Sequence, residues 1–205
     1  MTTPAKPDDV HAIKTQLREQ ARKNRVGQAN KDEISKQICA AFMTLPEYVK
    51  AKTVMFYVDA GSEVRTRHDL PAALASGKRI VVPYCIVETN ELELFLLEEM
   101  SELVEGAYKI LEPKAELRNL PAKRVQPEEL DLVMVPGTAF DPSGGRMGQG
   151  KGYYDRLLAH ARADAPLIAL AFECQMFPAI PVSAHDVFMD KVLTEKQVYL
   201  GRGRK

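Results

Sequence analysis

The sequence contains no tryptophan, few cysteines and no excess of charge of either sign. Cys39, Cys85 and Cys174 lie far apart without Cys-x-x-Cys spacing, so we expect reduced thiols in a cytoplasmic protein and neither a zinc site nor a disulfide framework. Basic and acidic residues number 28 each, whereas proteins that bind nucleic acid through its phosphates usually carry a basic excess. No stretch reaches the roughly 18 apolar residues of a membrane span, and the first ten residues lack the apolar core of a signal peptide. We therefore expect neither a nucleic acid nor a membrane as a partner.

The chain has the size of one domain. Its 205 residues, of which 45% are hydrophobic, suffice for one well-buried α/β core and are marginal for two. No internal repeat or low-complexity linker marks a boundary. We therefore expect a single domain over residues 1–205 and a monomer, with the basic last five residues, GRGRK, forming a frayed and solvated tail.

Four continuous apolar runs are typical of strands that are covered on both faces. They are TVMFYV (53–58), RIVVPYC (79–85), DLVMVP (131–136) and PLIALAF (166–172). The strictly alternating ELELFLL (91–97) predicts a half-exposed strand that is antiparallel or at an edge. Helices are predicted over 8–25, after Asn30 with Glu33 completing a capping box, in a short segment ending at Gly77, and over 153–163. This order indicates an α/β fold with a mostly parallel, Rossmann-like sheet, helices on both faces, and ligands at the carboxyl ends of its strands.

Residues 144–158, GGRMGQGKGYYDRLL, place five glycines within nine positions directly before a predicted helix. The stretch approaches a P-loop, but Gly152 stands where the Mg²⁺-binding Ser or Thr belongs, and it also misses the G-x-G-x-x-G pattern. Glycines allow positive φ, so successive N–H groups can converge on one anion, which a helix N-terminus also favours. Arg146 and Lys151 add full charges, and Asp155 offers an oxygen ligand for Mg²⁺. The loop therefore predicts a phosphate site; the alternative is a flexible surface loop with a capping aspartate.

A second basic cluster lies on the first predicted helix. Lys14, Arg18, Arg22 and Arg25 fall along one stripe of that helix. Such a stripe is ordinarily a solvated face. It gains functional meaning only if the helix packs across the mouth of the sheet.

The segment GRMGQGKGYYDR resembles the G-x-R-x-G-x-G-x-G-Y-Y-D-R signature of the 5-formyltetrahydrofolate cyclo-ligase family, also called methenyltetrahydrofolate synthetases. Other landmarks of the family follow in order across nearly the whole chain. They are Lys14-Thr-Gln-Leu-Arg18, Glu63-Val-Arg-Thr66, the stretch from Gly106 to Glu112-Pro113, and HDVFMDKVLTE (185–195). Met147 stands where a leucine is usual, and the segment 114–127 does not align.

The resemblance implies a fold like that of the NagB/RpiA/CoA-transferase group and an ATP- and Mg²⁺-dependent enzyme. It implies conversion of 5-formyltetrahydrofolate to 5,10-methenyltetrahydrofolate with release of ADP and phosphate, and Arg146 and Lys151 as the catalytic cations. The residues implied for ATP are Lys14, Thr15, Gln16, Leu17, Arg18, Arg146, Met147, Gly148, Gln149, Gly150, Lys151, Gly152, Tyr153 and Tyr154. Those implied for the folate are Val58, Glu63, Gln149, Gly150, Lys151, Gly152 and Tyr153, and those implied for the metal are Asp155 and Asp190.

Several roles stay open on the residues alone. A carboxylate such as Glu63 can accept two hydrogen bonds from a pterin ring, and it can equally be a surface acid in a turn. Any acid of the segment from His185 to Glu195 can reach a metal, and only the resemblance selects Asp190. A small-molecule kinase, a sugar-phosphate enzyme on a similar sheet, and a non-catalytic nucleotide or folate binder remain alternatives.

Overall fold

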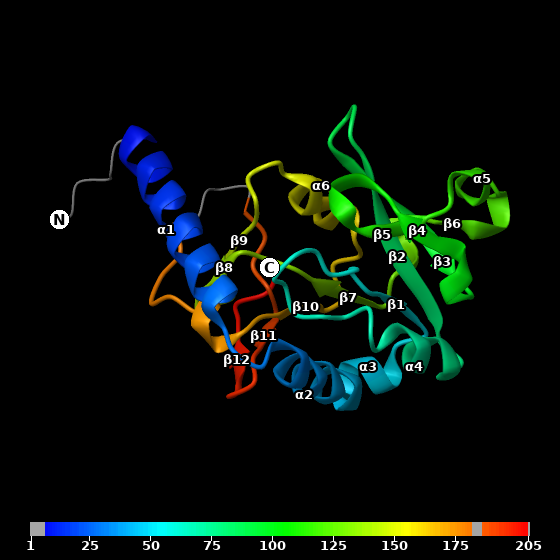
Figure 1. Cartoon of the computed structure of the whole chain (residues 1–205), viewed down its shortest axis with the longest axis horizontal. Coiled ribbons are helices and arrows are strands. Elements are labelled where there is room, and N and C mark those ends of the chain that lie inside the picture. Colours follow the sequence, from blue (N-terminus) through cyan, green and yellow to red (C-terminus); the bar gives the residue numbers. More distant parts are fainter. Residues whose placement is uncertain (1–6, 182–185, 205) are drawn as a thin grey trace.

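The computed structural model describes residues 7–181 and 186–204, which form an eight-stranded sheet in the order β12-β11-β10-β7-β1-β2-β3-β6 (Figure 1). Five neighbouring strands, β11, β10, β7, β1 and β2, are parallel to one another. On either side of this group, β12 runs antiparallel to β11 and β3 runs antiparallel to β2. The sheet strands are β1 (Thr53–Met55), β2 (Arg79–Ile86), β3 (Glu91–Leu97), β6 (Arg124–Val125), β7 (Leu132–Val135), β10 (Leu167–Leu170), β11 (Lys191–Leu193) and β12 (Val198–Leu200). The mostly parallel sheet predicted from the sequence is confirmed.

The alternating segment forms β3 and pairs antiparallel with β2, as predicted. It does not lie at the edge of the sheet, because the two-residue β6 pairs with its other side. Two small antiparallel pairs lie outside the main sheet: β4 (Leu103–Glu105) with β5 (Leu111–Pro113), and β8 (Ala139–Phe140) with β9 (Arg146–Met147).

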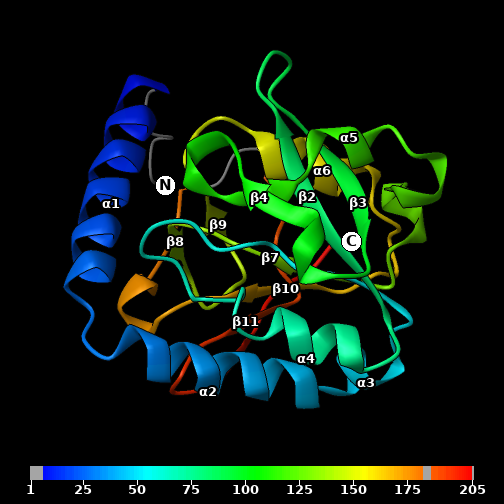
Figure 2. The same ribbon diagram turned by 45° about the vertical axis from the view of Figure 1, so that its right-hand side comes forward.

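Helices cover both faces of the sheet. The helices are α1 (Pro7–Gly27), α2 (Lys31–Thr44), α3 (Pro46–Lys50), α4 (Leu70–Ala75), α5 (Ala115–Arg118) and α6 (Tyr153–His160). In both views α2, α3 and α4 form one layer, while α1 stands apart beside β8 and β9 (Figures 1 and 2). The predicted capping box is wrong: Asn30 adopts a left-handed conformation, with φ of 53°, and makes no side-chain cap bond to the described residues.

The buried strands divide their side chains between two cores, because successive residues of a strand point to opposite faces. Val54 and Phe56 pack in the cluster that includes Phe42 of α2. Met55, between them, packs in the cluster that includes Leu157 of α6. The continuous apolar runs are therefore explained by burial on both faces.

The frayed tail predicted for the last five residues is wrong for those that the structure describes. Gly203 is buried, and Arg204 donates hydrogen bonds to four backbone carbonyls, including those of Ala161 at 2.9 Å and Ala165 at 2.5 Å. The segment is ordered because its basic side chain has acceptors within the fold. Lys205 lies outside the described residues.

Within residues 7–181 and 186–204, none of the helices combines the length and the apolar character that crossing a membrane requires.

Candidate functional site

The glycine loop begins in the β8–β9 hairpin, where a buried aspartate fixes its shape. Asp141 Oδ1 accepts hydrogen bonds from the backbone N–H groups of Ser143 at 2.9 Å and Gly145 at 3.0 Å, and Oδ2 accepts one from Ile180 at 2.8 Å. Gly150 and Gly152 then adopt positive φ of 94° and 74°, a region that suits glycine. Gly152 is the N-cap of α6, so the loop delivers the chain directly into the helix N-terminus, as predicted.

Helix α1 packs across this loop. The Nε of Arg18 donates to the carbonyl oxygen of Gly148 at 3.0 Å, and the guanidinium of Arg22 donates to the side-chain oxygen of Gln149. Lys14 pairs with Asp186, with Nζ and Oδ2 3.1 Å apart. The basic stripe is therefore not simply a solvated face, because it joins two segments that lie about 130 residues apart in the sequence.

The loop and α1 border a cavity of about 560 Å³, which is within the usual range for small-molecule sites. It opens at the carboxyl ends of parallel strands, because its lining includes Val58 beyond β1, Cys85 near the end of β2, and Pro136 directly after β7. Of the residues predicted for the site, those that line it are Lys14, Arg18, Val58, Glu63 and every residue from Arg146 to Asp155.

Four predicted site residues do not line the cavity. Leu17 packs in a small apolar cluster with Ala21 and Met147, and Thr15 and Gln16 are its neighbours on α1. Asp190 lies at the amino end of β11, where its Oδ2 accepts the N–H of Leu167 at 2.7 Å. Asp190 is absent from the cavity lining, whereas Asp155 is part of it. The structure does not bring Asp190 together with Asp155.

Arg146 forms an ion pair with Asp155 beneath the cavity. The arginine side chain is 4% exposed and the aspartate side chain is 44% exposed, so the pair runs from the protein interior to its surface. The Nε of Arg146 and the Oγ1 of Thr138 are buried and have no hydrogen-bond partner within the described part of the chain. Both residues line the cavity, so the floor offers polar groups to a ligand.

Lys151 lies at the rim of the cavity, where it contacts the hairpin that β4 and β5 form. Its Nζ donates to the hydroxyl of Tyr108 at 2.7 Å and lies 4.3 Å from the centre of the tyrosine ring. This hydrogen bond lowers the pKa of Tyr108. Tyr108 and the following Lys109 both have positive φ, near 58°, which is unfavourable for residues other than glycine. Sequence reasoning missed Tyr108, although it falls within the Gly106–Pro113 landmark.

Glu63 lies in the loop after β1 and lines the cavity. The N–H of Ala60 donates to its Oε2 at 3.0 Å, and the guanidinium of Arg25 lies 3.7 Å from Oε1. Arg25 is itself held by the hydroxyl of Ser62, at 3.0 Å. Burial raises the pKa of Glu63, an effect that Arg25 opposes. The cavity lining therefore combines this carboxylate with several basic side chains.

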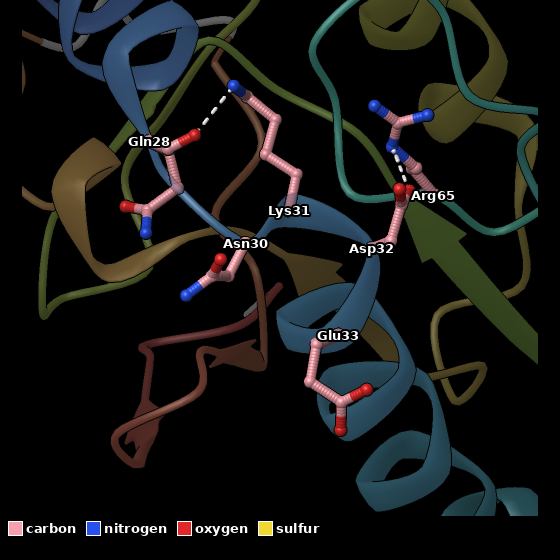
Figure 3. A pocket seen from close by; sticks show the side chains of 6 residues that line it. All are labelled: Gln28, Asn30, Lys31, Asp32, Glu33 and Arg65. Carbon is pink, nitrogen blue, oxygen red and sulfur yellow. Dashed lines mark hydrogen bonds and ion pairs between the residues drawn. The ribbon is translucent and has the colours of Figure 1, made fainter.

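A second hollow, of about 610 Å³, lies at the start of α2 (Figure 3). Its two basic side chains are already engaged: Lys31 donates to the carbonyl oxygen of Gln28 at 2.7 Å, and Arg65 pairs with Asp32 at 2.7 Å. None of the residues predicted for the site lines this hollow, whereas most of them line the cavity beneath α1, so we place the candidate site there.

The carboxyl edge of a parallel sheet, a glycine loop leading into a helix and several basic side chains together define an α/β protein whose cavity has the features that favour a phosphorylated ligand. The model of the 5-formyltetrahydrofolate cyclo-ligase family matches residues 10–195, so the chain belongs to this enzyme family. The expected resemblance is confirmed.

Characterised relatives are similar over most of their length. The chain is 32% identical to 5-formyltetrahydrofolate cyclo-ligase of Escherichia coli K12, covering 82% of this chain and 91% of the relative. It is 35% identical to the enzyme of that name from Mycolicibacterium smegmatis, over 73% and 76% of the two chains. The NMR structure of Aquifex aeolicus 5,10-methenyltetrahydrofolate synthetase superimposes with a TM-score of 0.79 at 33% identity, covering 94% of this chain and 95% of that one.

Proposed function

We propose that the protein converts 5-formyltetrahydrofolate and ATP to 5,10-methenyltetrahydrofolate, ADP and phosphate in the cavity beneath α1. The observation that carries this proposal is that one cavity combines groups that suit phosphate with a carboxylate that suits a pterin ring. Basic residues and the glycine loop line it together with the half-buried carboxylate of Glu63. Family membership supports a folate substrate.

The phosphate end of the proposed site consists of the glycine loop, the start of α6 and the cations around them. Lys14 and Arg18 approach from α1, Arg146 lies at the floor, and Lys151 lies at the rim. Backbone N–H groups at a helix N-terminus and full positive charges both stabilise bound phosphate. Binding at this end requires Lys151 to leave Tyr108 and Lys14 to exchange a contact with Asp186 for one with phosphate.

The folate end consists of Val58, Glu63 and the aromatic Tyr153. An ionised Glu63 accepts hydrogen bonds from the 2-amino and N3 groups of the pterin, and Arg25 favours the ionised form.

The carboxylates fit a magnesium ion that arrives with the nucleotide. Mg²⁺ is commonly held by one or two carboxylates plus substrate phosphates. Asp155 and Asp186 both line the cavity, and the described residues contain no larger cluster of metal-ligating side chains. When bound, the ion would neutralise negative charge on the phosphates. Asp190 takes no part, because its carboxylate is engaged at the amino end of β10.

In the proposed reaction the formyl oxygen attacks the γ-phosphorus of ATP, and ADP leaves. The resulting iminium phosphate is attacked at carbon by N10, which loses its proton, and the C–O bond then breaks to release phosphate and the methenyl product. Phosphoryl transfer depends mainly on positioning and charge neutralisation, which Arg146 and Lys151 supply. No protein nucleophile is needed.

The test is an absorbance assay for the methenyl chromophore, with quantification of ADP. We expect both products in a one-to-one ratio only when 5-formyltetrahydrofolate, ATP and Mg²⁺ are all present. ADP formation with another acceptor and none with the folate would establish a kinase instead. Tight binding of both substrates without turnover would establish a binder.

A further inference from the structure

Residues 201–204, here called the terminal segment, contact both ends of the stretch that carries the proposed phosphate site. That stretch begins at Ser143, passes through the glycine loop, and ends after α6. The terminal segment lies outside the cavity, and none of its residues lines it.

At the front end, the terminal segment packs tightly against the start of the glycine loop. The N–H of Arg202 donates to the carbonyl oxygen of Ser143 at 2.8 Å, and the N–H of Met189 donates to that of Gly144 at 2.8 Å. A Cβ atom on Gly201 would lie 2.9 Å from the Cα of Gly144 and would clash with the Met189 carbonyl oxygen. The glycines are therefore required by this close approach of three backbone segments.

At the rear end, Arg204 binds the carbonyl groups at and beyond the end of α6. One guanidinium nitrogen donates to Leu158 at 3.4 Å and Ala161 at 2.9 Å, and the other donates to Arg162 at 2.6 Å and Ala165 at 2.5 Å. The last carbonyl groups of a helix have no partners within the helix, and a cation there is favourable for the helix dipole. Arg204 meets both requirements.

This contact matters because α6 has only eight residues. Isolated helices of that length are unstable in water, so the position of α6 depends on contacts at its ends and on its buried face. Its N-terminus directly follows Gly152, so any displacement of the helix moves the backbone N–H groups of the glycine loop. Displacement of this kind weakens binding of a group that is recognised by those N–H groups.

We propose that Arg204 is a positioning residue for the nucleotide end of the site, acting through the C-terminus of α6. This inference rests on the proposed function, because it takes the glycine loop and the start of α6 to hold the phosphates. Of the residues that form the proposed folate end, only Tyr153 belongs to α6, whereas Val58 and Glu63 follow β1, so folate binding depends less on Arg204 than nucleotide binding does.

The experiment compares Arg204→Gln with the matched control Arg202→Gln. Both variants remove one positive charge from the terminal segment, but Arg202 contacts Ser143 through its backbone N–H, which the substitution retains. Calorimetric titration of the full chain measures the affinity for a Mg²⁺ complex of non-hydrolysable ATP and, separately, for 5-formyltetrahydrofolate. We expect Arg204→Gln to weaken the nucleotide about tenfold while the folate stays within about twofold, and Arg202→Gln to change neither. Arg204→Lys, which keeps the charge without the planar fork, should fall between the two.

Equal nucleotide affinity in the two glutamine variants overturns the proposal, as does an equal loss of both ligands. If Arg204→Gln does not fold, Arg204→Lys decides: nucleotide affinity within twofold of the wild type overturns it. A wild-type protein that binds no nucleotide refutes the proposed function itself, a result distinct from the others. Hydrogen exchange supplies the second readout. We expect faster exchange over residues 153–160 in Arg204→Gln than in Arg202→Gln.

Discussion

Arg146 and Asp155 form an ion pair that joins the β8–β9 hairpin to the first turn of α6, directly below the cavity. The arginine is buried and the aspartate is half-exposed, so the aspartate is the partner that a ligand can reach. In the proposed enzyme Asp155 would hold the nucleotide-bound metal, and the guanidinium of Arg146 would pair with phosphate. The pair thereby holds opposite charges next to each other in the cavity lining.

The first prediction concerns Asp155. The substitution Asp155→Asn should raise the Mg²⁺ concentration needed for half-maximal activity at least about tenfold, because an amide is a weaker ligand than a carboxylate. Steady-state rates across a Mg²⁺ titration measure this effect. Asp164→Asn, which alters an exposed aspartate away from the cavity, serves as the control. An unchanged Mg²⁺ requirement in Asp155→Asn would remove this residue from the metal site.

The second prediction concerns Lys151. The substitution Lys151→Ala should lower turnover on the order of a hundredfold, because it removes a cation that stabilises the transferring phosphoryl group. Its only protein contact in the described structure that would be lost is with the exposed Tyr108, so the unfolding midpoint should change little. Methenyl formation is measured beside Lys196→Ala, an exposed lysine outside the cavity. Turnover equal to that control would exclude Lys151 from catalysis.

The third prediction follows from the raised pKa of Glu63. Burial disfavours its ionised form in the folded protein, so the carboxylate lowers stability above the pKa of the unfolded chain, and this cost disappears as the pH falls below that value. Glu63→Gln should therefore gain free energy of unfolding relative to the wild type at pH 7, with the gain disappearing near pH 4. Urea unfolding at the two pH values measures it.

The same variant should bind 5-formyltetrahydrofolate more weakly, because Gln offers one acceptor oxygen in place of two. If Glu63→Gln is more stable than the wild type at pH 7 and also binds the folate more weakly, then Glu63 serves binding and lowers the free energy of unfolding. Unchanged folate affinity would contradict its assignment to the pterin.

The fourth prediction concerns Asp141, whose carboxylate accepts three backbone N–H groups and the hydroxyl of Ser143. In Asp141→Asn one oxygen becomes an NH₂ group that faces donors, so the variant should lose about 2–4 kcal/mol of unfolding free energy. Denaturant unfolding measures the loss, and Asp164→Asn again provides an exposed control. A loss below about 0.5 kcal/mol would show that the glycine loop keeps its shape without this carboxylate.

The sequence determined much of this protein without help from the structure. Continuous apolar runs predicted the strands of the parallel sheet, because in a strand that is buried on both faces every side chain contacts the core and is apolar. The glycine-rich stretch predicted a loop leading into a helix, because its backbone needs positive φ at Gly150 and Gly152. Family membership could also be predicted from the sequence, because the glycine-rich signature is long and its residues are consecutive in the chain.

Only the tertiary structure decided which distant residues share the site. The stripe on α1 is a solvated face by its spacing, and it became part of the cavity because Arg18 and Arg22 reach the glycine loop. Asp190 does not line the cavity, because it precedes β11 and its carboxylate accepts the N–H of Leu167 at the amino end of β10. Periodicity reports which face of an element is buried, whereas proximity between elements depends on strand order and on packing. The order of the C-terminal segment could not be predicted from the sequence for the same reason. The four carbonyl groups that bind Arg204 become its neighbours only after folding.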